Sequence, residues 1–194
     1  DPTRIQQTIT DMQTKFKVQD EGELSDYLGV KVEKHKDGTI EFTQPQLIDS
    51  ILADLRLLSQ GTGELLSKGA GSINASKPSA TPSTHDTKMH KDTNGKPFDY
   101  SWEYRSVIGK MNFLEKSTRG EIAFSVHQCA RFMASPMRSH GEAVKRIGRY
   151  LLGTRDKGYI IKPDVSKSFE CYVDADYCGN WDPLHSDDPN SAKS

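Results

Sequence analysis

The chain has 194 residues, of which 34% are hydrophobic and 27% charged, and its net charge is −1. This length suits one domain of ordinary size or two small ones, and no apolar run approaches the roughly 18 residues of a membrane-spanning helix. The N-terminal sequence DPTRIQQ lacks the basic and apolar regions of a secretory signal. Three cysteines without a framework spacing indicate reduced thiols, so we expect an intracellular protein, in the cytoplasm or the nucleus.

The first 57 residues predict a helix, a β-hairpin and a second helix. The first helix is predicted by apolar residues at helical spacing: Ile5, Ile9, Met12 and Phe16. Around the turn sequence Lys36-Asp37-Gly38, apolar residues alternate with polar ones, as in a hairpin with one apolar face: Leu28, Val30, Val32, Ile40 and Phe42. Thr43 is a candidate N-cap for the second helix. That helix has its own apolar stripe: Ile48, Ile51, Leu52 and Leu55.

A change of composition separates this region from the next one. Of the 26 residues from 59 to 84, 19 are Gly, Ser, Thr, Pro, Ala or Asn. Such a segment cannot bury enough apolar area to offset the entropy that it loses on ordering. We therefore expect a flexible linker over residues 58–99.

The second half of the chain predicts three basic helices and two strands. Helices are indicated around Val107 to Leu114, over about 119–134, and from the candidate N-cap Ser139 to Gly153. The sequences GYIIKP and SFECYVDADY then predict strands. Residues 105–162 hold 12 Lys and Arg against 4 Asp and Glu, whereas residues 163–194 hold 2 against 7. This asymmetry suggests a polyanion partner beside a metal site, although a charge run can equally be a solvated helix face.

Two segments resemble the polymerase region of copia-type LTR retrotransposons. YLGVKVEKHKDGTIEFTQPQLIDSIL is similar to the family's hairpin and helix downstream of the polymerase catalytic motif. YRSVIGKMNFLEKSTRGEIAFSVHQCARFMASPMRSHGEAVKRIGRYLLGT, followed by CYVDADYCGNW, keeps the order of several short family motifs that end in Asp-Ala-Asp. The chain departs from the family at Gly120, where a proline is usual, and at Tyr177 and Cys178, which replace a tryptophan and a small residue.

The resemblance implies an α+β fold of four parts. Residues 1–57 would be the end of the reverse transcriptase palm, the primer-grip hairpin and the start of the thumb, followed by the flexible linker at 58–99. Residues 100–162 would be a three-helix connecting region, and residues 163–194 the first strands of an incomplete RNase H-like fold. Because the chain begins with Asp1 rather than Met, we expect it to be a piece of a longer Pol polyprotein.

Two acids in CYVDADYCGNW are the candidate metal ligands. Asp174 and Asp176 lie two residues apart, so they point to the same face of a strand. The resemblance gives Asp174 the role of the first RNase H carboxylate. Two-metal hydrolysis needs Mg²⁺ ions about 4 Å apart held by several carboxylates, more than these two acids supply. We therefore expect Mg²⁺ to act in the intact parent, and neither tight Mg²⁺ binding nor RNase H activity in this chain alone.

Other interpretations of the same stretch are weaker. DADYCGNWDPLH partly matches a calcium-binding loop, but Cys178 and His185 occupy ligand positions that do not fit, and the preceding residues predict a strand. Cys171, Cys178 and His185 lack the close cysteine pair of most zinc sites. Two surface acids on an edge strand remain the plain alternative.

Basic residues of the third helix are the candidate nucleic-acid contacts. Lys145, Arg146 and Arg149 lie beside or opposite its apolar stripe, and Arg119 belongs to the same basic block, with Arg131, Arg138, Arg155 and Lys157. Such residues neutralise phosphates without reading sequence. By resemblance, Leu28, Gly29 and Val30 would hold the primer end, with Gly29 permitting close backbone approach. The alternative is a hairpin that packs its apolar face on a helix.

The resemblance also implies a function. The parent would synthesise DNA on an RNA template and degrade the RNA strand, and this chain would supply scaffold and grip rather than chemistry. The expected partners are an RNA–DNA hybrid or duplex nucleic acid and the rest of the Pol polyprotein, with no membrane. The rival hypothesis is a non-enzymatic nucleic-acid-binding remnant or a domesticated module.

Overall fold

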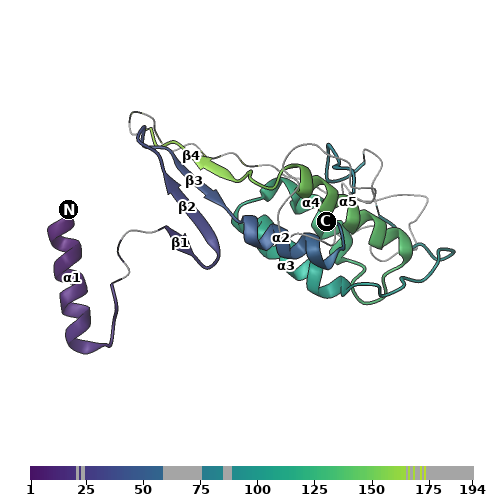
Figure 1. The fold of residues 1–194 in the computed structure, drawn as a ribbon, viewed down its shortest axis with the longest axis horizontal. Coiled ribbons are helices and arrows are strands. Elements are labelled where there is room, and N and C mark those ends of the chain that lie inside the picture. The colour runs from purple at the N-terminus through teal and green to yellow at the C-terminus, as the bar shows by residue number, and fades with distance from the viewer. Residues whose placement is uncertain are drawn as a thin grey trace.

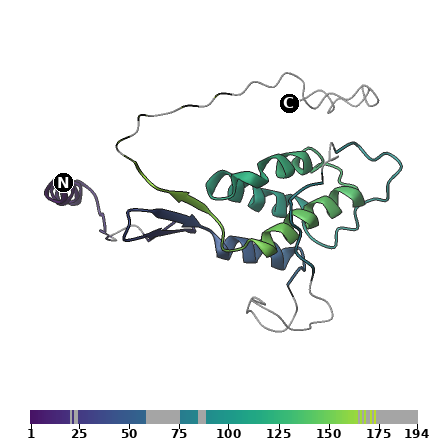
Figure 2. The same ribbon diagram turned by 90° about the horizontal axis from the view of Figure 1, so that it is seen from above.

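The computed structural model describes residues 1–20, 22, 25–58, 76–84 and 89–164, together with residues 166, 168, 171 and 173. These residues form three parts that follow one another along the molecule (Figures 1 and 2). Helix α1 (Pro2–Lys15) lies at one end, a small β-sheet lies in the middle, and a body of packed helices lies at the other end. Among the described residues, none of the helices combines the length and apolarity needed to cross a membrane.

The sheet has four antiparallel strands in the order β1-β2-β3-β4. These are β1 (Asp26–Tyr27), β2 (Val30–Lys34), β3 (Ile40–Thr43) and β4 (Tyr159–Ile161). The predicted hairpin at Lys36-Asp37-Gly38 is confirmed as the β2–β3 connection, and Gly38 has the positive φ of 83° that favours glycine. The predicted strand in GYIIKP is β4. It pairs with β3, so that Tyr159 lies opposite Phe42 and the chain returns to the hairpin after α5.

A second tight turn replaces part of the predicted strand around Leu28. Leu28 and Gly29 have φ values of 52° and 76°, and they connect the paired residues Tyr27 and Val30. Positive φ at both central positions is the geometry of a two-residue hairpin turn that matches the twist of its strands. Leu28 therefore lies at a turn, with 71% of its surface exposed, rather than on the apolar face of a strand.

The helical body has one apolar core. It is built from α2 (Pro45–Asp54), α3 (Tyr104–Ser117), the 3₁₀ turn η1 (Gly120–Ile122), α4 (Ala123–Ala130) and α5 (Arg138–Gly153). The second predicted helix of this half is thus a 3₁₀ turn followed by a helix that ends at Ala130. The centre of the core consists of fully buried side chains from α2 to α5: Ile48, Ile51, Leu52, Val107, Ile108, Met111, Leu114, Val126, Val144 and Leu151.

This core joins regions that the sequence places in separate domains. Helix α2, from the predicted palm-and-thumb region, packs against both α3 and α5 of the predicted connecting region. Arg155, just after α5, reinforces the contact through two bonds to Asp49, Nε to Oδ1 at 2.7 Å and Nη2 to Oδ2 at 2.5 Å. The described helices on the two sides of the expected linker therefore share one core.

The described part of the expected flexible linker also differs from the prediction. Phe98 is buried and stacks edge-on against Trp102 at a centroid distance of 4.9 Å. Backbone bonds tie this segment to the start of α5, from Arg138 N to Lys96 O and from Phe98 N to Pro136 O. Residues 76–84 run along α5. Aromatic and backbone contacts thus hold residues whose polar composition predicts a linker.

Both predicted helix N-caps, Thr43 and Ser139, are wrong. Gln44, not Thr43, is the N-cap of α2, with Pro45 in the first turn. Helix α5 begins at Arg138, before the predicted cap Ser139. There the Nδ1 atom of His140 accepts a hydrogen bond from Met137 N at 3.0 Å, which supplies a partner for one of the free N–H groups at a helix start.

Helix α1 confirms the helix predicted at the start of the chain, but its apolar stripe is not buried. Asp1 caps the helix by accepting a hydrogen bond from Thr3 N at 3.0 Å. None of its residues is buried, and Ile5 and Phe16 are 62% and 66% exposed. The apolar stripe exists, but nothing in the described chain covers it.

Candidate nucleic-acid interface

Helix α5 carries the predicted basic residues on the side away from its buried stripe. His140, Val144, Ile147 and Leu151 face the core. Lys145, Arg146 and Arg149 are all partly exposed. Residues three or four positions apart are neighbours on a helix surface, so Arg149 lies next to both Lys145 and Arg146. The structure therefore brings these three predicted residues together as one basic surface on α5.

The neighbours of this surface differ from one residue to the next. Arg146 donates from Nη2 to the Thr81 hydroxyl at 3.1 Å. Lys145 lies near Asp99, whose pKa is held below its usual range mainly by hydrogen bonds from Ser101, with a smaller contribution from the Lys145 charge. Long-range attraction to phosphate remains available to all three cations because a polyanion interacts with the summed field as well as with single contacts.

Arg119 is a structural residue, which corrects its prediction as a phosphate contact. Its side chain is only 1% exposed. Nε donates to Glu121 at 2.7 Å, Nη1 to the Thr154 carbonyl at 2.9 Å and Nη2 to the Thr154 hydroxyl at 2.6 Å. The guanidinium also lies over the Tyr150 ring, 5.6 Å from its centroid. The charge ties η1 to the end of α5 and is inaccessible to a nucleic acid.

Other members of the predicted basic block also have internal partners. Arg155 is committed to Asp49, and its Nη1 atom donates to Asp156 at 2.8 Å. Arg131 donates to Gln128 at 2.8 Å and lies over the Phe132 ring. Arg138 and Lys157 are exposed. The formal charge of the block thus exceeds the charge that it presents to solvent.

The primer-grip residues of the prediction lie in the sheet, outside the helical body. Gly29 has an open environment, because a Cβ atom there would meet no atom within 4 Å. Its glycine is explained by the turn conformation, and the expected close approach of a primer end to this backbone stays a prediction. Val30 begins β2 and is half-buried, whereas Leu28 projects from the turn.

The predicted catalytic and metal-binding acids cannot be placed. Asp174 and Asp176 lie outside the described residues. In the part of the chain that the structure describes, one group of three potential ligands gathers, Glu33, His35 and Glu41, with ligand atoms within 4.8 Å of one another. These residues already pair within the hairpin, Glu33 with Lys31, and His35 Nε2 with Glu41 Oε2 at 3.4 Å. They are unrelated to the predicted RNase H acids.

Sequence reasoning missed the role of His140, whereas the free Cys129 agrees with the expected reduced thiols. His140 stacks on Phe132 at a centroid distance of 4.0 Å and bonds to the His90 carbonyl through Nε2 at 2.9 Å. Cys129 is buried, and burial raises the pKa of its thiol to about 12, which keeps it protonated and unreactive at neutral pH. The proline-to-histidine spacing before α5 was the available signal for His140, but it does not reveal a cap.

The chain is similar in sequence to transposon proteins of plants. The chain is 30% identical over 182 residues to the "Retrovirus-related Pol polyprotein from transposon RE1" of Arabidopsis thaliana, and 27% identical over 182 residues to that from transposon RE2 of the same plant. It is 28% identical over 173 residues to the one from transposon TNT 1-94 of Nicotiana tabacum. The chain is similar to part of retrotransposon Pol polyproteins.

The similarity covers nearly all of this chain but little of the relatives. The aligned segments include 94% of the chain for the two Arabidopsis proteins and 89% for the tobacco protein. The chain spans about 11% of the length of the first two and 12% of the third. No family model matches the chain, and no solved structure matches it.

Proposed function

We propose that this chain is the part of a copia-type Pol polyprotein that lies between the polymerase catalytic motif and the RNase H acids, and that it helps to hold nucleic acid. The observation that carries the proposal is the similarity to transposon Pol polyproteins over 94% of the chain. In this proposal the hairpin of β2 and β3 is the primer grip and α2 begins the thumb. The chain itself supplies scaffold and grip, and the chemistry belongs to the parent.

The basic surface of α5 supports a role in nucleic-acid binding. Lys145, Arg146 and Arg149 are partly exposed and adjacent, as required for contacts with successive phosphates. Glu142 is the one acid within α5 itself, and Asp99 lies near Lys145. We propose an RNA–DNA hybrid or a duplex as the ligand, bound through its backbone without sequence preference.

Fluorescence anisotropy with a labelled RNA–DNA hybrid tests this proposal. We expect weak binding at micromolar protein in low salt, with a steep loss of affinity as salt is added, because counterions are released from the phosphates. The double variant Lys145→Gln/Arg149→Gln should weaken binding and reduce the slope of log affinity against log salt by up to about 0.9 for each lost contact. The double variant Arg4→Gln/Lys15→Gln removes the same two charge types from α1 and should bind as the wild type does.

Two results would contradict the proposal. Absence of binding at micromolar protein and low salt would remove the nucleic-acid role, and equal losses in the two double variants would show that only net charge matters. Magnesium-dependent cleavage of a hybrid by this chain, abolished by Asp174→Asn, would overturn the assignment of the chemistry to the parent.

The rival proposal is a non-enzymatic remnant or a domesticated binding module. Reading the frame on both sides of the corresponding genomic sequence separates the two. An intact upstream Tyr-x-Asp-Asp motif and intact downstream acids would favour a segment of a polymerase, and stop codons would favour a remnant.

A further inference from the structure

Residues 76–84 form a segment bound along helix α5. Ser79 N donates to the Arg149 carbonyl at 3.2 Å. The hydroxyl of Thr81 accepts from Arg146 Nη2 at 3.1 Å and donates to the Ser83 carbonyl at 2.7 Å. Thr81 itself is exposed, and its segment has neither helical nor strand structure. A hydroxyl in such a place is accessible to a modifying enzyme.

Arg146 has unused hydrogen-bonding capacity next to this hydroxyl. Its Nε atom is buried and has no hydrogen-bond partner among the described residues. Nε and Nη2 form one edge of the guanidinium, the fork that binds two oxygens of one carboxylate or phosphate. This chain uses the same two atoms of Arg155 to bind both oxygens of Asp49. In Arg146 one atom of the fork contacts Thr81 and the other is left without a partner.

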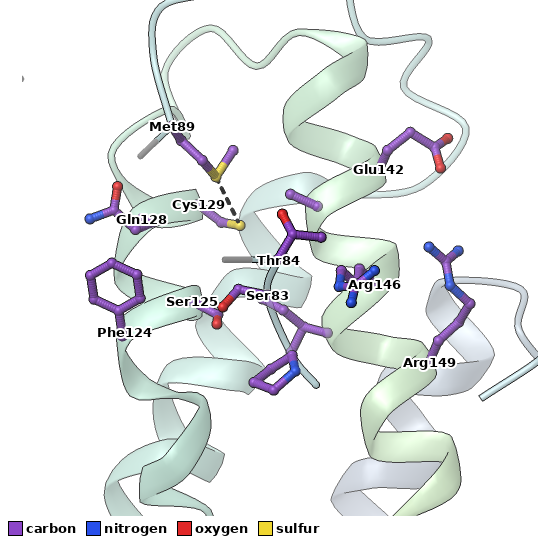
Figure 3. A pocket seen from close by; sticks show the side chains of 13 residues that line it. Ser83, Thr84, Met89, Phe124, Ser125, Gln128, Cys129, Glu142, Arg146 and Arg149 are labelled. Carbon is purple, nitrogen blue, oxygen red and sulfur yellow. Dashed lines mark hydrogen bonds between the residues drawn. The ribbon is translucent and has the colours of Figure 1, made fainter. Parts of the chain in front are cut away.

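A cavity of about 180 Å³ lies next to Arg146, between α4 and α5. Its lining includes Pro82, Ser83, Arg146 and Arg149 together with the acid Glu142, whereas Thr81 lies outside it. Figure 3 shows the Arg146 side chain between α5 and the segment that carries Ser83 and Thr84, with Arg149 on the next turn of the helix. The charge beside Thr81 is thus positive and partly desolvated, which strengthens its attraction for a phosphate.

The sequence at this position has a further property. Of the nine prolines in the chain, two follow a serine or threonine, in Thr81-Pro82 and Ser135-Pro136. A Ser/Thr-Pro pair in an irregular, exposed segment is the acceptor sequence of proline-directed protein kinases. The fork of Arg146 lies beside Thr81. Ser135, in its different environment, is therefore a matched control acceptor for Thr81.

We propose that Thr81 is a phosphorylation site and that the Nε and Nη2 atoms of Arg146 hold its phosphate. A proline-directed kinase would transfer the γ-phosphoryl group of ATP to Thr81 Oγ1. A P–O bond forms to that oxygen, the bond to the β-phosphate breaks to leave ADP, and the hydroxyl proton is released. The hydrogen bond from Thr81 to Ser83 is lost. Two bonds from Arg146 to ionised phosphate oxygens replace its single bond to an uncharged hydroxyl.

The added phosphate carries a charge of about −1.5 to −2 at neutral pH. It would fasten residues 76–84 to α5 and offset the basic surface there. Phosphorylation would therefore act against the polyanion binding proposed above, but the phosphate site does not depend on that binding. A phosphate held by Arg146 can be observed without any nucleic acid present.

The test uses the full chain, ATP and a proline-directed kinase, with mass spectrometry to locate the phosphate and ³¹P NMR to titrate it. We expect phosphate on Thr81 and, in the folded protein, a second phosphate pKa about one unit below its ordinary value near 6, a tenfold change in acidity. The shift should vanish in urea and in Arg146→Gln. A phosphate on Ser135, followed in Thr81→Ala, should titrate near the ordinary value. The midpoint temperature of thermal unfolding should be about 2–4 °C higher for the protein phosphorylated on Thr81 than for the unmodified protein.

Three outcomes would overturn the proposal. The kinase could leave Thr81 unmodified. The Thr81 phosphate could titrate alike in the folded protein and in urea, a comparison that needs no variant. The lowered pKa could persist in folded Arg146→Gln, which would assign the phosphate to another group.

Discussion

The helical body and the part formed by α1 and the sheet contain similar residue types but bury them very differently. In the body, apolar side chains from α2 to α5 are fully buried in one core. Among the described strand residues, Val32 alone is buried, and α1 has no buried residue at all. An amphipathic pattern therefore specifies a helix or strand, whereas stability requires a partner surface for that pattern.

The largest expected difference between the two parts is between Ile108→Ala and Ile5→Ala. Both residues are isoleucines within helices, but Ile108 is fully buried in α3 and Ile5 is mostly exposed on α1. Ile108→Ala should lower the free energy of unfolding by about 2–5 kcal/mol, from lost burial and the cavity left behind. Ile5→Ala should change it by less than about 0.5 kcal/mol, as for a surface substitution. Urea denaturation followed by circular dichroism measures both.

An equal loss in the two variants would contradict the comparison. It would mean that the stripe on α1 is covered in solution, for example by a second copy of the chain. Sedimentation at two protein concentrations distinguishes that result, because self-association depends on concentration.

Arg119→Gln should give the next largest effect. The buried guanidinium donates three hydrogen bonds within the body, two of them to Thr154. Hydrogen bonds to charged groups are worth about 1.5–3 kcal/mol, so we expect a loss of that size in the free energy of unfolding. Arg4→Gln on the exposed helix α1 is the control and should be nearly neutral.

The same variant also tests the revised role of Arg119. Folded Arg119→Gln should bind a labelled RNA–DNA hybrid with the salt slope of the wild type, because the residue does not reach solvent. A reduced slope in the folded variant would return Arg119 to the nucleic-acid interface.

The difference between the two parts also explains how much could be predicted from sequence. Local signals were sufficient for the hairpin at Lys36-Asp37-Gly38 and for the presence of the helices, though not for where each helix begins, since turn chemistry and apolar periodicity act over a few residues. The predictions that failed depend on contacts distant in sequence. The carbonyl that Arg119 bonds belongs to Thr154, 35 residues later. Phe98 is buried by the aromatic rings around it, although its flanking composition predicts a linker.

Prediction of the candidate nucleic-acid interface from sequence has the same limit, because contacts distant in sequence are not visible in it. Periodicity identified Lys145, Arg146 and Arg149 as surface residues of α5, and their exposure agrees with that. Spacing alone could not separate them from Arg119 and Arg155, because these two residues also bond to partners far away in the sequence, Thr154 and Asp49. A count of basic residues therefore overestimates the charge available to a ligand.

His140 makes the body sensitive to pH. Burial lowers the pKa of His140 from its ordinary 6.5, against smaller opposing effects of the His90 carbonyl and Asp92. The neutral ring accepts from Met137 N through Nδ1, and protonation removes this acceptor. Because the unfolded chain binds the proton more tightly, stability is complete above pH 6.5, falls as the pH drops through that value, and levels off below the folded pKa. Urea midpoints from pH 8 to 5 measure this.

The control for this prediction is His140→Gln, which cannot titrate. Its urea midpoint should be lower than that of the wild type at pH 8, and the difference should shrink toward pH 5. A constant difference across this range would show that the histidine is not linked to folding through its proton.

The smallest expected changes in the free energy of unfolding come from two glycines, one on the outer side of the body and one on its inner side. A Cβ atom at Gly109, on the exposed side of α3, would meet nothing within 4 Å, whereas one at Gly148 in α5 would lie 2.5 Å from Leu55 Cδ1. Gly109→Ala should raise the free energy of unfolding by about 0.5–1 kcal/mol, since alanine loses less entropy in a helix. Gly148→Ala gains the same propensity but overpacks the α2–α5 contact, so its net effect should be destabilising. Urea denaturation of both variants decides this, and stabilisation by Gly148→Ala would mean that the core between α2 and α5 is looser than the buried leucines indicate.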